Sequence, residues 1–476
     1  MDRVFQKTND YAVGISMYSN RIGNYEFGNT ENKHGWHTAD GMFYLYNGDT
    51  AQFDEGYWTT IDPYRLPGTT VDTKSLEDGA HHSVKSPQQW VGGSNNGKFA
   101  SIGMYLDKTN EGMDLNAKKS WFLLDDQIIN LGADINGRTD DSIETIIENR
   151  LLSEAHTISI NGDNFVDEAK DVVGWVNMTS KNQTDNIGYI IPDTNNNVNM
   201  YKEERTGKYT DINEYFVSDK EYVHDYMTIH QNYGKVAENE SYEYVIVPGK
   251  TDEEIAAIAD QPKYEVLANE KDVQAIETEE LLLANFWEEA QLEGKVKAHN
   301  PVSVIVEEQD GNKLAITLSN PKQNNEIVSI TLFDEIDSII SVDDRITIDE
   351  QTIQLDSANL QGTSQTVVVQ LEKEELDKER LEELVASASD LKADNYTKES
   401  WDVLQASLLR AEEVLADDQV SQKRIDEAVE ELDLAIQALI EVEDEIPEPK
   451  PVDKSALEKA VEKAADLKKA DYTEES

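Results

Sequence analysis

The sequence predicts a mainly β protein in which a large antiparallel β-sandwich is followed by a smaller β-sandwich domain and then by a helical module. Three observations carry this prediction. Short runs of β-branched and aromatic residues, separated by polar turns, fill residues 1–250 and continue over 265–371. From about residue 372 the apolar residues recur every three or four positions instead of every two. A stretch of the helical part is then repeated further along the chain.

Residues 1–250 are predicted to form the large sandwich, because many short strands joined by polar turns are typical of antiparallel sandwiches. Runs such as YAVGISMYS (11–19) and FASIGMYLD (99–107) have the composition of strands. In SWFLLDDQIINLGADI (120–135), Asp125–Asp126 separates two apolar stretches and predicts a hairpin turn.

Residues 265–371 continue the strand pattern in shorter units and are predicted to form the second, smaller β domain. Within VSVIVEEQDGNKLAITLS (302–319), Asp310–Gly311 stands between two alternating runs. This arrangement predicts another tight hairpin.

Residues 376–442 are predicted to form a three-helix module. The segments 381–391, 400–416 and 421–442 each place Leu, Val, Ile or Ala on one face and charged residues on the other. Short connections between such helices favour a small bundle. The prolines and charges of EDEIPEPKPVDKS (443–455) are typical of an extended linker.

The residues after the linker repeat the start of the helical module. LEKAVEKAADLKKADYTEES (457–476) matches LEELVASASDLKADNYTKES (381–400) at 11 of 20 positions. The second copy, residues 456–476, stops before the equivalent of Trp401 and therefore contains one predicted helix. A single amphipathic helix cannot bury a core by itself. We therefore expect the chain to be an internal part of a longer protein.

The composition limits the classes of partner. The formal charge of −54 argues against nucleic acid or an anionic membrane surface as the main partner. Residues 1–120 carry 11 Lys and Arg against 15 Asp and Glu, a net charge of −4, so the other 356 residues carry −50. The absence of cysteine excludes disulfides, thiol nucleophiles and cysteine-ligated zinc. Neither a membrane-spanning apolar stretch nor a signal-peptide pattern is visible.

The candidate site lies in NRIGNYEFGNTENKHGWHTADGMFYLY (20–46), which combines carboxylates, amides, histidines and aromatic residues. Amides suit sugar hydroxyl groups and aromatic faces suit sugar rings, but the same residues also build complex turns, so both interpretations stay open. Glu26 and Glu31 could form a glycosidase pair, although their spacing does not give their separation in space. We predict no metal site, because Gly35 interrupts any helix carrying His34 and His37.

Two acidic segments, 134–141 and 193–199, do not meet the EF-hand register. They are predicted to be turns between strands. No cofactor is predicted.

Three motifs carry a family resemblance. The pattern N-Y-E-x-x-N-x-E-N-x-x-G-W (24–36), followed by DGMFYLY (40–46) and P-Y-x-x-P-G-T-T (63–70), resembles the central β domain of the polysaccharide lyases that include hyaluronate, chondroitin AC and xanthan lyases. The likeness extends more weakly over about 370 residues, including 265–371 as the small C-terminal β domain. It implies a supersandwich of the galactose mutarotase-like type and cleavage by β-elimination.

In that family an Asn neutralises the uronate carboxylate, a Tyr/His pair transfers protons, and an Arg assists. The resemblance places these groups on an α/α-toroid domain, which this sequence does not contain. It implies supporting catalytic roles for Glu26 and Asn29, the E-x-x-N pair of the sandwich. Substrate-binding roles are predicted for Asn24, Asn32 and Trp36, with a scaffold role still open for the last two.

The helical repeats resemble FIVAR modules, which accompany surface and secreted proteins of Gram-positive bacteria. The segment DNYTKESW (394–401) carries this likeness. It implies an extracellular or cell-wall-associated protein, with a cell-wall or glycan ligand for the helices. The expected substrate is an anionic polysaccharide. The alternative is a non-catalytic carbohydrate-binding or adhesion protein.

Overall fold

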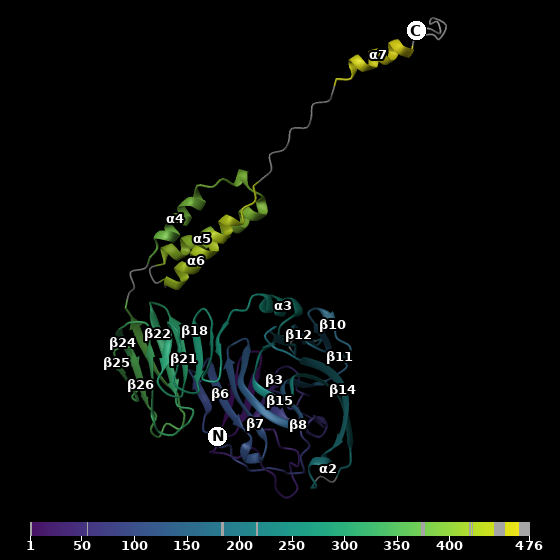
Figure 1. Cartoon of the computed structure of the whole chain (residues 1–476), viewed down its shortest axis with the longest axis vertical. Helices are drawn as coiled ribbons and strands as arrows, with labels where there is room; N and C mark the ends of the chain where they lie inside the picture. Colours follow the sequence, from purple (N-terminus) through teal and green to yellow (C-terminus); the bar gives the residue numbers. More distant parts are fainter. Residues whose placement is uncertain are drawn as a thin grey trace. The chain divides into compact units, whose positions relative to one another are not determined.

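The computed structural model describes residues 2–54, 56–181, 185–215, 218–372, 377–417, 420, 422–441 and 453–465. The chain folds into two compact units, residues 1–373 and 374–476. Strands dominate the first unit and helices make up the second (Figure 1). The predicted mainly β fold class is therefore confirmed.

A three-stranded and a twelve-stranded antiparallel sheet form the first β domain. The small sheet has the order β1-β2-β3, with strands β1 (Arg3–Lys7), β2 (Ala12–Met17) and β3 (Asp40–Tyr46). The large sheet contains β4 (Thr70–Asp72), β5 (Val91–Asn95), β6 (Ala100–Asp107), β7 (Asp114–Leu123), β8 (Ile128–Leu152), β9 (Thr157–Ile160), β10 (Asp163–Asn164), β11 (Glu168–Ala169), β12 (Gly174–Thr179), β13 (Ile187–Ile191), β14 (Val198–Lys208) and β15 (Glu221–Pro248). Three short helices accompany these sheets: α1 (Tyr57–Thr60), α2 (Tyr209–Ile212) and α3 (Asp252–Asp260).

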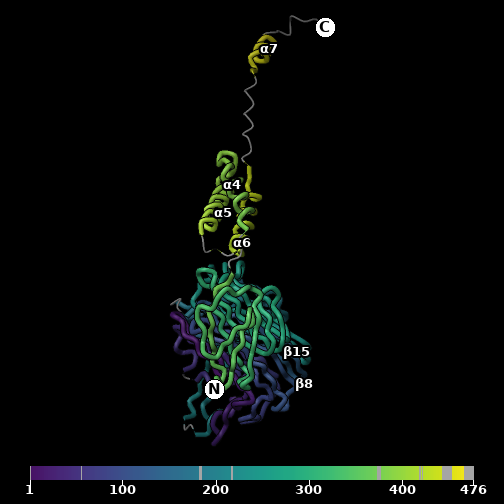
Figure 2. The backbone as a smooth tube through the Cα atoms, turned by 90° about the vertical axis from the view of Figure 1, so that its left-hand side faces the viewer, coloured from purple at the N-terminus to yellow at the C-terminus, as the bar shows by residue number. Residues whose placement is uncertain are grey.

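The long strands β8 and β15 pair with each other along most of their length, and Figure 2 shows them at one side of the domain. The prediction that 134–141 is a turn between strands is wrong. These residues continue β8, where Ile135 pairs with Glu240 and Arg138 pairs with Val236. Asp134, at a φ of 52°, lies next to one of the irregularities that bend the strand without ending it.

The other predicted turns are present. The β7–β8 hairpin turns at Asp125–Asp126, and the hairpin between β21 (Val302–Gln309) and β22 (Lys313–Ser319) turns at Asp310–Asn312. The segment from Asp193 to Asn197 connects β13 to β14. The described part of the chain contains no group of three or more His, Asp or Glu side chains suited to a metal ion.

The second β domain consists of a seven-stranded and a five-stranded sheet. The larger has the order β16 (Glu265–Asn269), β17 (Val273–Glu277), β18 (Leu281–Phe286), β21, β22, β27 (Gln365–Leu371) and β24 (Ile336–Val342). The smaller has the order β19 (Ala290–Leu292), β20 (Val296–Ala298), β23 (Ile327–Leu332), β26 (Thr352–Asp356) and β25 (Ile346–Asp349). Their facing apolar residues form a core of their own.

A buried amide joins the two β domains. The side chain of Asn285, which is 0% exposed, accepts hydrogen bonds from the hydroxyls of Ser101 (3.0 Å) and Ser303 (2.8 Å). Its amide nitrogen donates to the backbone oxygen of Ile102 (3.0 Å) and the hydroxyl of Ser120 (3.0 Å). All four hydrogen-bonding positions of the amide are occupied, so this polar contact carries no penalty for unpaired groups.

The second unit contains the helices α4 (Glu379–Ser389), α5 (Lys398–Ala416) and α6 (Gln422–Gln437), whose apolar faces share one core. A further helix, α7 (Ser455–Ala465), matches the start of the predicted second repeat. Most of the predicted linker at 443–455, and residues 466–476, lie outside the described residues. Among the described helices, none combines the length and apolar character needed to cross a bilayer.

A buried ionic cluster connects β3 to the large sheet. The carboxylate of Asp40 lies 2.9 Å from the amine of Lys108 and 2.8 Å from Nδ1 of His37. Burial alone would raise the pKa of Asp40, but the charge of Lys108 and the hydrogen bond from His37 lower it below its ordinary value. The amine of Lys119 donates to the backbone oxygens of Asp40 (3.2 Å) and Gly68 (2.6 Å).

We expect Asn285→Leu to destabilise the β unit by about 2–4 kcal/mol, because four buried hydroxyl or carbonyl partners each lose a hydrogen bond. Urea unfolding followed by tryptophan fluorescence measures the change. Asn110→Ala is the control, since the amide of Asn110 bonds the backbone of Lys85 at an exposed position. Equal stability of the two variants would contradict the role assigned to Asn285.

We expect Lys119 to make stability depend on pH. Burial lowers the pKa of Lys119 to about 7, with the charge of Asp40 opposing this effect. In the unfolded chain the pKa is about 10.4. Between these values the unfolded chain holds a proton that the folded chain has released, so stability rises with pH, by at most about 1.4 kcal/mol per unit. Below pH 7 the buried amine of Lys119 is charged in the folded chain, and the loss of stability from burying that charge reaches its full value.

The measurement is urea unfolding of the native chain and Lys119→Met from about pH 7 to about pH 9.5, below the usual tyrosine titration. The native curve should rise relative to that of Lys119→Met. Lys98→Met, which changes an exposed lysine, should keep the native slope. Parallel curves for the native chain and Lys119→Met would show that Lys119 does not titrate as expected.

Candidate functional site

The predicted site lies in the loop between β2 and β3, which two neighbouring segments hold in place. On one side, the backbone amide of Asn24 donates to the backbone oxygen of Val84 (2.9 Å), and the backbone amide of Gly79 donates to the backbone oxygen of Lys33 (2.8 Å). On the other side, the amide of Lys33 donates to the backbone oxygen of Ile212 at the end of α2 (3.1 Å). The β2–β3 loop is therefore fixed along both edges.

The tip of this loop is a tight turn built from asparagines. Asn29, Thr30 and Asn32 have φ values of 51°, 63° and 58°, in the left-handed region that asparagine enters more easily than most residues. The side-chain amide of Asn32 donates to the backbone oxygen of Glu26 (2.8 Å) and closes the turn. The asparagine-rich sequence thus has a backbone role, as the turn interpretation predicted.

The turn presents Glu26 and Asn29 to solvent. Both side chains are exposed, and within the described residues neither the carboxylate of Glu26 nor the amide of Asn29 has a hydrogen-bond or ion-pair partner. These two groups are free to accept and donate hydrogen bonds to a ligand. The structure brings them together on one turn, and their supporting catalytic roles stay predictions.

Asn24 and Trp36 lie beneath the loop surface, with 6% and 4% of their area exposed. The side-chain amide of Asn24 donates to the backbone oxygen of His81 (3.0 Å), and its oxygen accepts from the backbone amide of Tyr25 (2.8 Å). The indole of Trp36 donates to the backbone oxygen of Glu77 (3.1 Å). The predicted substrate contacts of these residues, and of Asn32, stay predictions, and these internal bonds favour a role in shaping the loop.

Lys33 clamps the loop to both neighbouring segments. Its amine lies 3.0 Å from a carboxylate oxygen of Glu214 and 3.4 Å from one of Asp78. The hydrogen bond from Lys33 lowers the pKa of Glu214, and the same contact raises the pKa of Lys33. Because Glu26 and Glu31 are also exposed, the outer edge of the loop is acidic.

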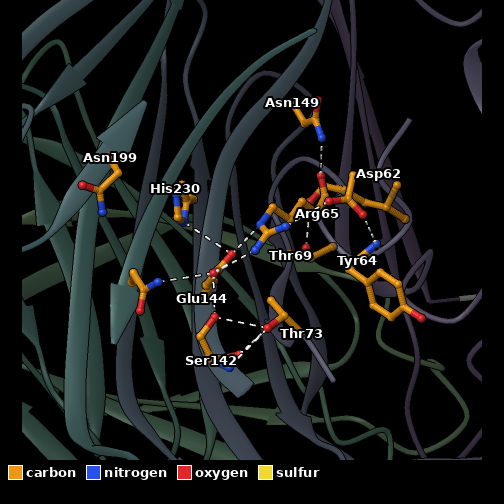
Figure 3. A network of polar contacts seen from close by, with 12 residues as sticks. Asp62, Tyr64, Arg65, Thr69, Thr73, Ser142, Glu144, Asn149, Asn199 and His230 are labelled. Carbon is orange, nitrogen blue, oxygen red and sulfur yellow. Dashed lines mark hydrogen bonds and ion pairs between the residues drawn. The ribbon is translucent and has the colours of Figure 1, made fainter. Parts of the chain in front are cut away.

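A second polar network lies next to the loop and was not anticipated from the sequence (Figure 3). The guanidinium of Arg65 makes two hydrogen bonds to the carboxylate of Glu144, of 2.7 and 3.1 Å, and a third to Asp62 of 3.0 Å. Nδ1 of His230 lies 3.4 Å from Glu144. Burial would raise the pKa of Glu144, but His230 and Arg65 together lower it to about 2.

A ring stack joins this network to the loop. The indole of Trp36 stacks on the ring of Tyr64, with ring centres 5.0 Å apart, and Tyr64 directly precedes Arg65. Arg65 lies within the P-Y-x-x-P-G-T-T motif, at a position that the motif leaves unspecified. Its partner Glu144 is 79 positions away on β8, and only the pairing of the large sheet brings the two together.

Comparisons with known families assign most of the chain. Residues 1–259 match polysaccharide lyase family 8, super-sandwich domain, and residues 265–329 match the C-terminal beta-sandwich domain of the same family. Residues 377–439 match the FIVAR domain.

Individual relatives agree with this assignment. The polysaccharide lyase 8 family protein HylA of Enterococcus faecalis is 49% identical over 476 residues, 100% of this chain and 34% of that protein. The xanthan lyase of a Bacillus species is 34% identical over 70% of this chain and 36% of that protein. The chain thus spans about a third of the length of these relatives.

Solved structures of lyases share the fold of the β unit. The Paenibacillus xanthan lyase superposes with a TM-score of 0.73 at 32% identity, over 78% of this chain and 37% of that one. The chondroitin AC lyase of Streptomyces coelicolor A3 gives 0.69 at 29% identity, over 78% and 49%. With the family models matching more than half of the residues, the chain belongs to polysaccharide lyase family 8.

Proposed function

We propose that this chain is the β-sandwich and helical part of an extracellular polysaccharide lyase that cleaves a uronate-containing glycan by β-elimination. Hyaluronan, chondroitin and xanthan are the candidate classes of substrate. The observation that carries the proposal is the exposed Glu26–Asn29 pair on a loop held along both edges. Backbone hydrogen bonds along both edges favour a rigid loop, and groups that act on a substrate need rigid support, to within about 0.5 Å of their working positions.

The chemistry divides between two parts of the enzyme. β-Elimination removes the C5 proton of a uronate and breaks the bond from C4 to the leaving oxygen. Neutralising the uronate carboxylate makes that proton more acidic. We assign the Asn, Tyr, His and Arg of this step to an α/α-toroid domain, and the greater length of the relatives is consistent with an additional domain.

We propose that the substrate binds in a cleft with the toroid on one side and the β unit on the other. The β unit would support the reaction from its own side of that cleft. A carboxylate favours the protonated form of a nearby acid/base group, which is the role proposed for Glu26. The amide of Asn29 would hydrogen-bond within the cleft without adding charge. The acidic edge of the loop does not attract an anionic glycan, so the positive charge that binds it would come from the toroid wall.

The FIVAR module would act separately from cleavage. Its three helices bury one shared core and form a compact unit distinct from the β unit. We propose that it attaches the enzyme to a cell wall or glycan, which places the protein outside the cell.

We expect the 476-residue chain alone to show no appreciable lyase activity on hyaluronan, chondroitin or xanthan, because proton abstraction requires groups that we assign to the toroid. Absorbance of the unsaturated uronate product measures this. Robust turnover would contradict the proposal. In a form extended to include the toroid, glycan binding without cleavage would favour the non-catalytic adhesion alternative.

In that extended form we expect Glu26→Gln to lower kcat at least about tenfold with little change in KM, since the charge acts on proton transfer and not on glycan affinity. Asn29→Gly should also reduce turnover. Glycine keeps the left-handed backbone of Asn29, so this change removes the amide alone.

Glu31→Gln is the matched control, because Glu31 is an exposed glutamate of the same loop. Its turnover should stay near that of the native enzyme. If Glu26→Gln and Glu31→Gln behaved alike, Glu26 would have no specific place in the site.

A further inference from the structure

A groove lies where the first β domain meets the second, between β13, α3 and the start of β16, and it is distant in sequence from the β2–β3 loop. Its volume is about 530 Å³, within the range of pockets that hold small molecules. Apolar side chains form most of its walls, among them Ile190, Ile258 and Val266. The polar groups in it include the side chains of Glu243 and Tyr264.

Local structure fixes the walls of the groove. Helix α3 begins at a capping box, in which Thr251 accepts from the amide of Glu254 and Glu254 accepts from that of Thr251. The helix inserts Ile255, which is 0% exposed, into the core beneath it. Pro262 follows the helix, and Tyr264 then returns to β15, where its hydroxyl reaches Glu243.

Two hydrogen bonds hold Glu243 in place. Its backbone amide donates to the side chain of Asn195 (3.0 Å), and its carboxylate oxygen Oε1 accepts from the hydroxyl of Tyr264 (2.9 Å). Within the described residues, no Lys, Arg or His forms an ion pair with this carboxylate. Burial raises the pKa of Glu243, and the hydrogen bond from Tyr264 opposes that shift.

A partly buried carboxylate without an ion pair is available to a cationic ligand, because pairing lowers the cost of burying its charge. The groove also carries Asp193, so a second negative group faces the same space. The complementary ligand has one positive charge on an apolar body. We propose that the groove binds an alkylammonium group, whose nitrogen pairs with Glu243 while its hydrocarbon chain lies against Ile190 and Ile258. This inference does not rest on the proposed lyase function.

Titration calorimetry of the full 476-residue chain with hexylammonium at low ionic strength tests the proposal. We expect saturable binding of one equivalent, and at least tenfold weaker binding of hexanol, which has the chain without the charge. Glu243→Gln should weaken hexylammonium binding at least tenfold. The control Asp126→Asn, which removes a carboxylate from the exposed β7–β8 turn, should leave binding unchanged.

Thermal melting separates loss of binding from loss of folding. Glu243→Gln should melt no lower than the native chain, because glutamine keeps the shape of the side chain and removes an unpaired charge. N-acetyl-lysine methylamide serves as a second probe. Stronger binding of this probe than of hexylammonium identifies a lysine of a partner protein as the natural group, and the reverse order identifies a free amine.

Three results would overturn the proposal. They are the absence of saturable hexylammonium binding, equal affinity for hexanol, and unchanged affinity in a folded Glu243→Gln variant.

Discussion

The buried ion pair between Asp40 and Lys108 is the constraint on which the rest of the first β domain depends. Asp40 begins β3 and Lys108 follows β6, so the pair joins the small sheet to the large one. Removing either partner of such a pair leaves a charge in a medium that solvates it poorly, at a cost of about 3–5 kcal/mol. Glu111 extends the cluster, because Lys108 lies 2.8 Å from it and the hydroxyl of Tyr18 donates to it over 2.7 Å. Tyr18 and Asp40 stand at the two ends of the β2–β3 loop, so the ionic cluster fixes both ends of the segment that carries Glu26 and Asn29.

Close packing inside the β2–β3 loop adds to the constraint that the ionic cluster places on its ends. A Cβ added to Gly35 would lie 2.5 Å from the ring of Tyr25 and 2.6 Å from the amide of Asn32, so any larger residue would push apart the turn that presents Glu26. Trp36 then joins the loop to the Arg65–Glu144 network through its stack on Tyr64. The bidentate geometry of Arg65 and Glu144 favours one orientation of the guanidinium. The loop is thereby coupled to β8, the longest partner of β15 in the large sheet.

The sequence predicted the elements whose signals are local. Period-two runs with Asp125–Asp126 and Asp310–Gly311 predicted hairpins, and the change to period three or four predicted the helices. Residues 134–141 were misread, because a run of Asp, Asn and Gly resembles a turn, whereas the ladder to β15 keeps it extended. The Arg65–Glu144 pair could not be predicted, since it depends on sheet pairing over 79 positions. The asparagine-rich motif did not distinguish ligand-facing side chains from buried ones, because burial is decided by the neighbouring segments.

The electrostatics of the loop bear on how Glu26 would act. Lys33 lies against Asp78 and Glu214, so its charge is already shared between two carboxylates and does not neutralise Glu26. The negative potentials of neighbouring exposed carboxylates add together. Salt screens this potential beyond a Debye length of about 8 Å, so it acts at short range. A protonated histidine or tyrosine of an opposing wall would be stabilised there, which raises its pKa. An acidic loop edge is thus unfavourable for attracting an anionic glycan but favourable for a group that must hold a proton for the leaving oxygen.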